Sequence, residues 1–197
     1  MKDKFFATLD VEYTSNKGSM ARNWSLPHEF PEVIEVGVVK FKNFNSKHFK
    51  KINLLFKSDK KLLSFYFQKL TKINQNYFNN FAKEPLGQYK KLNYFLKDVE
   101  KIFCIGTDKE MIEKNLYKKK YNFNFQNKIR DIRPLLAKKL DKKEDEIISS
   151  QLLNILGESK NLREHRALDD AMSVFFSLRI MSKKYGLSKK KINEMLP

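Results

Sequence analysis

Two acidic residues spaced two apart close an apolar run near the start of the chain. Asp10 and Glu12 follow the run at 5–9, and Thr14 stands two residues after Glu12. In an extended strand, residues i and i+2 point to the same face, so both carboxylates enter one small volume and repel each other. A divalent cation relieves that repulsion, and hard oxygen ligands suit Mg²⁺ or Mn²⁺, which can activate water. Taken alone, such a pair is more typical of an edge strand with two solvated acids.

A third acid and a histidine stand late in the chain, within residues 164–171. If a helix begins at Arg166, Asp170 falls on its apolar face. A carboxylate facing a core is costly unless it is paired or binds a metal, whereas Asp169 falls on the polar side. His165 precedes the helix, and an ordinary imidazole pKa of about 6.5 suits a general base that takes a proton from water. By itself, a histidine there is more often a cap or a surface residue.

The elements that must position these residues follow from the apolar pattern. Besides the first strand, β-branched residues predict a second strand at 33–41 and a third at 49–56, and we expect these three to form an antiparallel meander. Helical spacing runs from 62 to about 96, broken by a turn at 84–87.

In the second half, residues 101–105 predict a buried fourth strand, and Asp108 lies at or beside the start of a helix. We expect a fifth strand at 123–129. Further helices are predicted at 132–140, 146–156, 166–183 and, after a possible cap at Ser188, 189–195. Strands early, then helices alternating with strands, indicate a mixed sheet covered by helices.

The length and net charge of the chain limit the class of protein to which it can belong. The 197 residues fit one domain at 1–183, with 184–197 as a short basic C-terminal helix. Lys and Arg number 40 against 23 Asp and Glu, a net charge of +17 that favours a polyanionic partner such as nucleic acid. The excess of Lys can equally reflect an AT-rich genome.

The chain shows no sign of an oxidised or membrane-bound protein. One cysteine, Cys104, excludes an intrachain disulfide and agrees with a reducing compartment. No apolar stretch approaches the roughly 20 residues that a membrane span needs. We therefore expect a soluble cytoplasmic protein without a membrane partner; the sequence leaves open whether it forms a homodimer.

These motifs together resemble a known family. Asp-x-Glu-x-Thr at 10–14, an Asp at a strand-to-helix junction and His-x-Ala-x-x-Asp-Ala at 165–171 are similar to the DEDDh exonucleases. The segment at 31–37, after a Trp-bearing loop, resembles the branch of histone-mRNA 3′ exonuclease and sporulation-inhibitor proteins. The resemblance implies an α/β, RNase H-like fold, whose five-stranded mixed sheet is antiparallel in its first three strands, then parallel, and flanked by helices.

The resemblance also implies an activity. It predicts a 3′-5′ exonuclease that releases 5′-mononucleotides from single-stranded RNA or DNA 3′ ends with two divalent cations, Mg²⁺ or Mn²⁺. His165 would be the general base, and the metal ligands would be Asp10, Glu12, Asp108 and Asp170. Asp108 is the loosest match, and Asp98 and Asp131 are rivals placed less well relative to the strands.

Contacts with the substrate are predicted at Tyr13, Thr14, Trp24, Arg163 and Arg166. Trp24 could stack on a base, a contact worth about 1–3 kcal/mol, or anchor its own loop. The arginines could bind a phosphate or remain solvated. RNA is favoured because of the branch resemblance. A DNA exonuclease in repair or proofreading, and a non-catalytic nucleic-acid-binding or scaffold protein on the same fold, are the alternatives.

Overall fold

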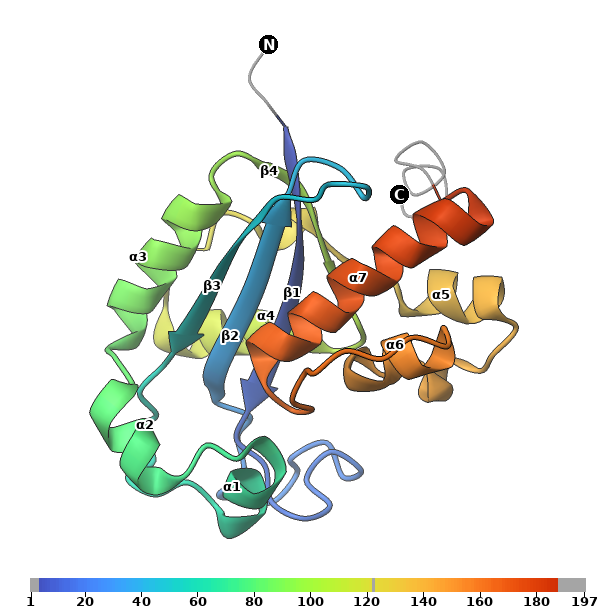
Figure 1. Cartoon of the computed structure of the whole chain (residues 1–197). Helices are drawn as coiled ribbons and strands as arrows, with labels where there is room; N and C mark the ends of the chain where they lie inside the picture. Colours follow the sequence, from blue (N-terminus) through green and yellow to red (C-terminus); the bar gives the residue numbers. More distant parts are fainter. Residues whose placement is uncertain (1–3, 122, 188–197) are drawn as a thin grey trace.

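A mixed sheet of five strands forms the centre of the computed structural model, which describes residues 4–121 and 123–187. The strand order is β3-β2-β1-β4-β5. β2 runs antiparallel to β1 and β3, whereas β1, β4 and β5 are parallel, which confirms the predicted mixed sheet (Figure 1). The strands span Phe5–Tyr13 (β1), Val33–Phe41 (β2), Phe49–Leu55 (β3), Val99–Cys104 (β4) and Ile129–Asp131 (β5).

Helices cover both faces of this sheet. The long helix α7 crosses one face, and α3 and α4 pack on the other (Figure 1). The helices span Phe65–Thr71 (α1), Gln75–Phe81 (α2), Pro85–Leu96 (α3), Asp108–Lys119 (α4), Arg133–Leu140 (α5), Leu152–Ile155 (α6) and Ala167–Tyr185 (α7). Among the described residues, no helix combines the length and apolar character needed to cross a membrane.

The alternation of side chains along β1 decides which residues meet α7. Leu9 and the other odd-numbered apolar residues pack with α3 and α4. Thr8 faces the opposite way, and its hydroxyl donates a hydrogen bond of 2.7 Å to the backbone oxygen of Ala171 in α7. Asp10 and Glu12 have the same parity as Thr8, so both carboxylates face the side covered by α7.

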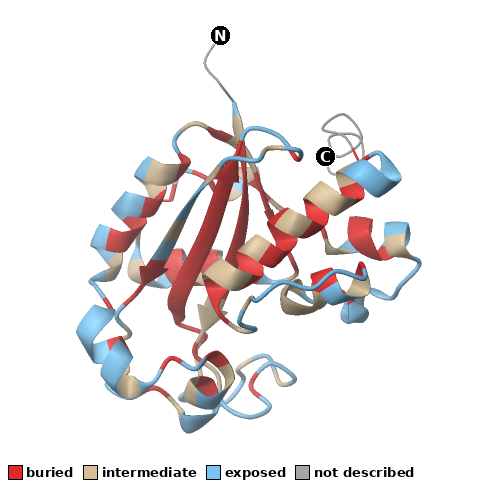
Figure 2. Ribbon diagram, in the orientation of Figure 1, coloured by how far each residue is buried: buried red, intermediate tan, exposed pale blue. Residues whose placement is uncertain are grey.

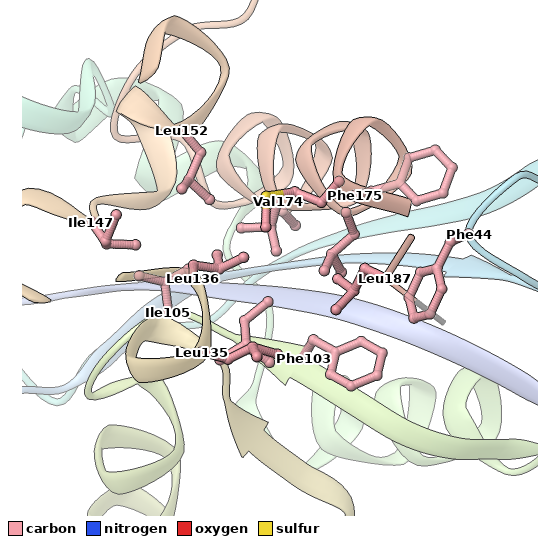
Figure 3. Close-up of a cluster of buried hydrophobic side chains, with 14 of the residues drawn as sticks. Phe44, Phe103, Ile105, Leu135, Leu136, Ile147, Leu152, Val174, Phe175 and Leu187 are labelled. Atoms are coloured by element: carbon pink, nitrogen blue, oxygen red, sulfur yellow. The ribbon is translucent and has the colours of Figure 1, made fainter. Parts of the chain in front are cut away.

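An apolar core under α7 holds that helix in place. Figure 3 shows side chains from α7, α5, α6, β4 and the loop after β2 meeting between the helix and the sheet. Phe175 of α7 is fully buried, with its ring centroid 4.7 Å from that of Phe41 in β2. The central strands are buried along most of their length (Figure 2). The N-terminal end of α7 is therefore anchored by packing further along the same helix.

The predicted fifth strand is misplaced. β5 begins only at Ile129, because Phe123 and Phe125 are buried by ring packing in a turn rather than by strand pairing. The alternating buried aromatic residues that suggested a strand therefore have another cause.

Three further predictions need correction. The turn predicted at 84–87 ends at Glu84. Pro85 is the first residue of α3, where its missing N–H costs nothing because that group has no partner within the helix. Residues 146–156 do not form one helix: Ile147 is extended, 3₁₀ turns flank it, and only α6 is α-helical. α7 extends two residues past its predicted end. The predicted helix at 189–195 lies outside the described residues.

Candidate active site

Three elements bring the predicted acidic residues together. Asp10 and Glu12 lie on β1, Asp108 is the first residue of α4, and Asp170 lies in the first turn of α7. Glu12, His165 and Asp170 offer ligand atoms that all lie within 4.8 Å of one another. Asp10, Asp108 and Asp170 expose only 4–5% of their surface.

Asp108 owes its place to the parallel pairing of β4 with β1. The chain leaves β4, turns through Gly106 at a φ of 80°, and enters α4 at Asp108. Its Oδ2 is buried and makes no hydrogen bond to any described residue. A carboxylate oxygen left in this way needs an outside partner, because an unpaired buried polar atom is costly.

Both rivals for the second acidic position are engaged elsewhere. Asp98 accepts a hydrogen bond of 2.8 Å from Lys40 Nζ. Asp131 Oδ1 accepts the backbone N–H groups of Gly106 and Arg133, each at 2.8 Å. Asp131 thus shapes the turn that leads to Asp108.

The acids perturb one another strongly. Burial, opposed in part by a hydrogen bond from Ser149, raises the pKa of Asp10 to about 7. Burial and the charge of Asp10 raise the pKa of Asp170 to about 9. The same two causes raise the pKa values of Glu12 and Asp108 well above the usual range. Raised pKa values at all four carboxyl groups mean that protein groups compensate poorly for the negative charge that their ionisation would create.

This donor set fits a hard divalent cation. It offers several carboxylate oxygens, one of them without a partner, and oxygen is the ligand type that Mg²⁺ and Mn²⁺ prefer. Cation binding would also remove the mutual repulsion that raises the pKa values.

Glycine lets α7 approach the sheet at this point. Gly37 in β2 pairs with Asp10, and a Cβ added to Gly37 would lie 2.2 Å from the backbone of Ala167 and Leu168. Any side chain here would displace the start of α7. The close approach brings Asp170 to the level of the acids on β1.

His165 lies in the turn that precedes α7. Its backbone is in the left-handed region, with a φ of 57°, and its N–H donates to Asp170 Oδ2 at 3.2 Å. Partial burial lowers the pKa of the imidazole. The ring is therefore neutral at physiological pH, as a general base has to be.

The residues predicted to contact substrate lie near the site in different roles. The Tyr13 hydroxyl lies 3.4 Å from Thr107 Oγ1, and the ring packs edge-on against Trp24 at 5.4 Å. Thr14 is buried and donates to the backbone oxygen of Phe30 at 2.8 Å. Trp24 Nε1 donates to the backbone oxygen of Thr14 at 3.1 Å, which fits the loop-anchor interpretation.

The two arginines differ sharply. Arg163 is largely exposed and reaches Asp169 Oδ2 at 3.2 Å. Arg166 is 9% exposed and binds both carboxylate oxygens of Glu35, at 3.1 and 2.7 Å. Arg163 has an exposed guanidinium, whereas two nitrogens of the Arg166 guanidinium already bind Glu35. The phosphate contacts of both residues stay predictions.

Sequence reasoning missed two residues of the site. Ser149 Oγ donates to Asp10 Oδ1 at 2.8 Å, and no local pattern around Ser149 indicates this contact across 139 residues. Glu35 is fully buried beside Glu12 on the neighbouring strand. An acid within the β-branched run at 33–41 was a signal that could have identified it.

Comparison with known proteins identifies the family. The model of the RNase_T family, described as exonuclease, matches residues 8–175. The chain belongs to this exonuclease family. The match confirms the predicted exonuclease family and makes the chain a nuclease.

Solved structures of several nucleases have a similar fold. The nuclease domain of 3'hExo, a DEDDh family member bound to rAMP, superposes with a TM-score of 0.78 at 18% identity, over 92% of this chain and 93% of that one. Cell-death related nuclease 4 (CRN-4) gives 0.74 at 16% identity, over 91% and 64%. A zinc-bound E. coli ExoI–ssDNA complex gives 0.72 at 9% identity, over 98% and 43%.

At these identities the likeness concerns the fold alone. A search of curated protein sequences found no match.

Proposed function

We propose that this exonuclease is a metal-dependent enzyme that removes 5′-mononucleotides from single-stranded 3′ ends, with RNA favoured over DNA. The observation that carries the proposal is the buried carboxyl cluster, with an orphaned Asp108 oxygen and a neutral imidazole at its edge. A protein that only binds nucleic acid needs neither of these features.

Each residue has a role in the proposed hydrolysis. Asp10, Glu12, Asp108 and Asp170 would hold two divalent cations, which supply Lewis acidity and orient the phosphodiester when bound. His165 accepts the proton of the attacking water at an imidazole nitrogen. The bond that breaks joins phosphorus to the 3′ oxygen of the preceding nucleotide, so the phosphate stays with the released 5′-nucleotide. Ser149 fixes the orientation of the Asp10 carboxylate.

Exposed aromatic residues on α1 and α2 support a single-stranded substrate. Phe65 and Phe81 are 81% and 56% exposed on α1 and α2. Tyr77, also on α2, lies against Arg166 at the start of α7, with the guanidinium carbon 5.7 Å from the ring centroid. Unpaired bases can stack on such rings, whereas the bases of a duplex are already stacked.

The preference for RNA rests on structural likeness. 3'hExo carries rAMP in one structure, and a similar 3′-exonuclease is bound to a histone mRNA stem-loop in another. ExoI, which binds single-stranded DNA, gives a slightly lower TM-score. We therefore retain a DNA exonuclease as the alternative substrate class.

A nuclease assay tests the proposal. Purified protein is incubated with matched single-stranded RNA and DNA oligomers labelled at the 5′ end, with Mg²⁺ or Mn²⁺ and with a chelator control. We expect metal-dependent shortening from the 3′ end, release of 5′-mononucleotides and faster cleavage of RNA. Faster cleavage of DNA would favour the alternative substrate. Intact oligomers that are nevertheless retarded in a gel would favour a non-catalytic binding protein.

A further inference from the structure

A fifth acid lies beside the metal-ligand candidates without belonging to them. Glu35 on β2 is the cross-strand partner of Glu12 on β1. Residues directly opposite in an antiparallel pair point to the same face, so both side chains face α7. By position alone, Glu35 could serve as a metal ligand.

The hydrogen bonds of Glu35 instead join it to other protein groups. Both carboxylate oxygens of Glu35 bind the guanidinium of Arg166, and Oε2 also accepts the backbone N–H of Ala167 at 3.0 Å. Asn53 Nδ2 donates to Oε1 at 2.8 Å. The carboxylate therefore has four donors from protein groups.

These bonds replace a missing local cap. Arg166, at the N-cap position of α7, makes no side-chain bond to the first turn of the helix. The Ala167 N–H is one of the donors that a helix start leaves unpaired, and Glu35 satisfies it from the neighbouring strand. A carboxylate at this end also interacts favourably with the helix dipole.

The residues on either side of this contact form the catalytic turn. His165 precedes Arg166 and has the left-handed φ of 57°, a conformation that persists only when surrounding contacts hold it. Asp170 closes the same turn through its bond to the His165 N–H. On the outer side, Arg166 lies against Tyr77 of α2.

We propose that Glu35 is a positioning residue which, through Arg166 and the Ala167 amide, holds His165 and Asp170 in register with the acids on β1, and that it is not a metal ligand. This inference rests on the proposed function for its catalytic consequence. The bidentate guanidinium contact fixes both distance and orientation, which a single-point contact cannot do.

The test compares Glu35→Gln with Glu12→Gln. For Glu35→Gln we expect kcat to fall about 10- to 100-fold, as for a small displacement of catalytic groups, with KM and the Kd for Mn²⁺ measured by calorimetry near their wild-type values. Glu12→Gln should weaken Mn²⁺ binding directly. A loss of Mn²⁺ affinity in Glu35→Gln as large as that in Glu12→Gln would make Glu35 a ligand and overturn the inference.

Hydrogen exchange gives a readout that does not depend on activity. Peptides covering residues 163–171 should lose amide protection in Glu35→Gln, and the matched change Glu84→Gln, in an exposed pair with Lys57, should leave them unchanged. Unchanged protection and unchanged kcat in Glu35→Gln would overturn the inference. If the wild-type protein cleaves no substrate but Glu35→Gln still loses this protection, the positioning role of Glu35 stands and the exonuclease proposal fails.

Two variants of Arg166 keep the test decisive if Glu35→Gln folds poorly. Arg166→Lys retains the charge but not the planar fork, and we expect a lower kcat with Mn²⁺ affinity kept. Arg166→Met leaves the Glu35 carboxylate buried without its ion partner, which is costly. Adding Glu35→Gln removes that unpaired charge, so the double variant should be more stable and more active than Arg166→Met alone. Strictly additive losses in the double variant would contradict the coupling.

Discussion

Asp169 and Asp170 are neighbours in the sequence but have different surroundings. Asp170 is buried, and its carboxylate joins Glu12 and His165. Asp169 Oδ2 accepts hydrogen bonds from the backbone N–H and the guanidinium of Arg163 at the surface. The two residues are chemically identical, and they differ only in the side of the first turn of α7 on which they lie.

The isosteric substitutions Asp170→Asn and Asp169→Asn exploit this difference. Asp170→Asn should lower kcat more than about 100-fold, since even outer contacts of a metal site contribute about 10- to 100-fold, whereas Asp169→Asn should retain most activity. Rates on a single-stranded oligomer, with circular dichroism as the folding control, check this. Equal losses would contradict the position of Asp170 on the inner face of α7.

His165 is close enough to Glu12 and Asp170 either to act as a base or to share a cation with them. The base role predicts that His165→Ala lowers kcat about 100- to 10,000-fold and leaves Mn²⁺ binding intact. Calorimetric titration with Mn²⁺, beside single-turnover rates, separates the two roles. Mn²⁺ binding lost together with activity would make His165 a ligand.

At the scale of elements, the active site depends on how closely α7 approaches β1 and β2. The Thr8 hydroxyl binds the backbone of α7, Glu35 caps the start of the helix, and Gly37 leaves room for it. The apolar contacts around Phe175 hold the helix further along. Contacts distributed over two strands thus set the position of the turn that holds His165 and Asp170.

Gly37→Ala tests this close approach, with Gly87→Ala as its matched control. The new Cβ at Gly37 would overlap the backbone of Ala167, so we expect a loss of about 1–3 kcal/mol of stability and a large loss of activity. A Cβ at Gly87, inside α3, meets no atom within 4 Å and should stabilise the protein by up to about 1 kcal/mol. Thermal unfolding and nuclease rates measure both. Wild-type activity in Gly37→Ala would show that α7 can move without cost.

At the scale of the whole molecule, the carboxyl cluster links stability to pH and to cations. The pKa values of Asp10 and Asp170, about 7 and about 9 in the folded chain, exceed the usual 3.8. Folding therefore favours their protonated forms, and these groups make the metal-free protein less stable as pH rises from about 4 through the folded pKa values. Glu29 behaves differently: its hydrogen bond with Arg22 lowers its pKa to about 2, so its contribution to stability is lost only in stronger acid.

Divalent cations should reverse this trend. Because the cations bind the ionised carboxylates, we expect the increase in melting temperature on adding Mg²⁺ or Mn²⁺ to grow between pH 5.5 and 8.5, while the chelated protein loses stability over the same range. Thermal unfolding at several pH values measures both, and Asp10→Asn should flatten the two curves. A cation effect independent of pH would contradict binding at this cluster.

Local patterns in the sequence determined much of this protein. The i, i+2 spacing placed Asp10 and Glu12 on one face, the apolar phase of α7 separated Asp170 from Asp169, and the chain order of the strands predicted the mixed sheet. These features depend on backbone periodicity, which short segments carry by themselves. The same reasoning failed at 123–129 and 146–156, where aromatic packing and two extended residues overrode local preference.

Only the tertiary structure decided the contacts that complete the site. Ser149 reaches Asp10 across 139 residues, Glu35 binds Arg166 across 131, and Gly37 matters because of a helix encountered 130 residues later. It also favours Asp108 over Asp98 and Asp131 as the proposed ligand, because Asp108 Oδ2 has no hydrogen-bond partner among the described residues. Such pairings arise from packing of distant segments, whose partners no local spacing records.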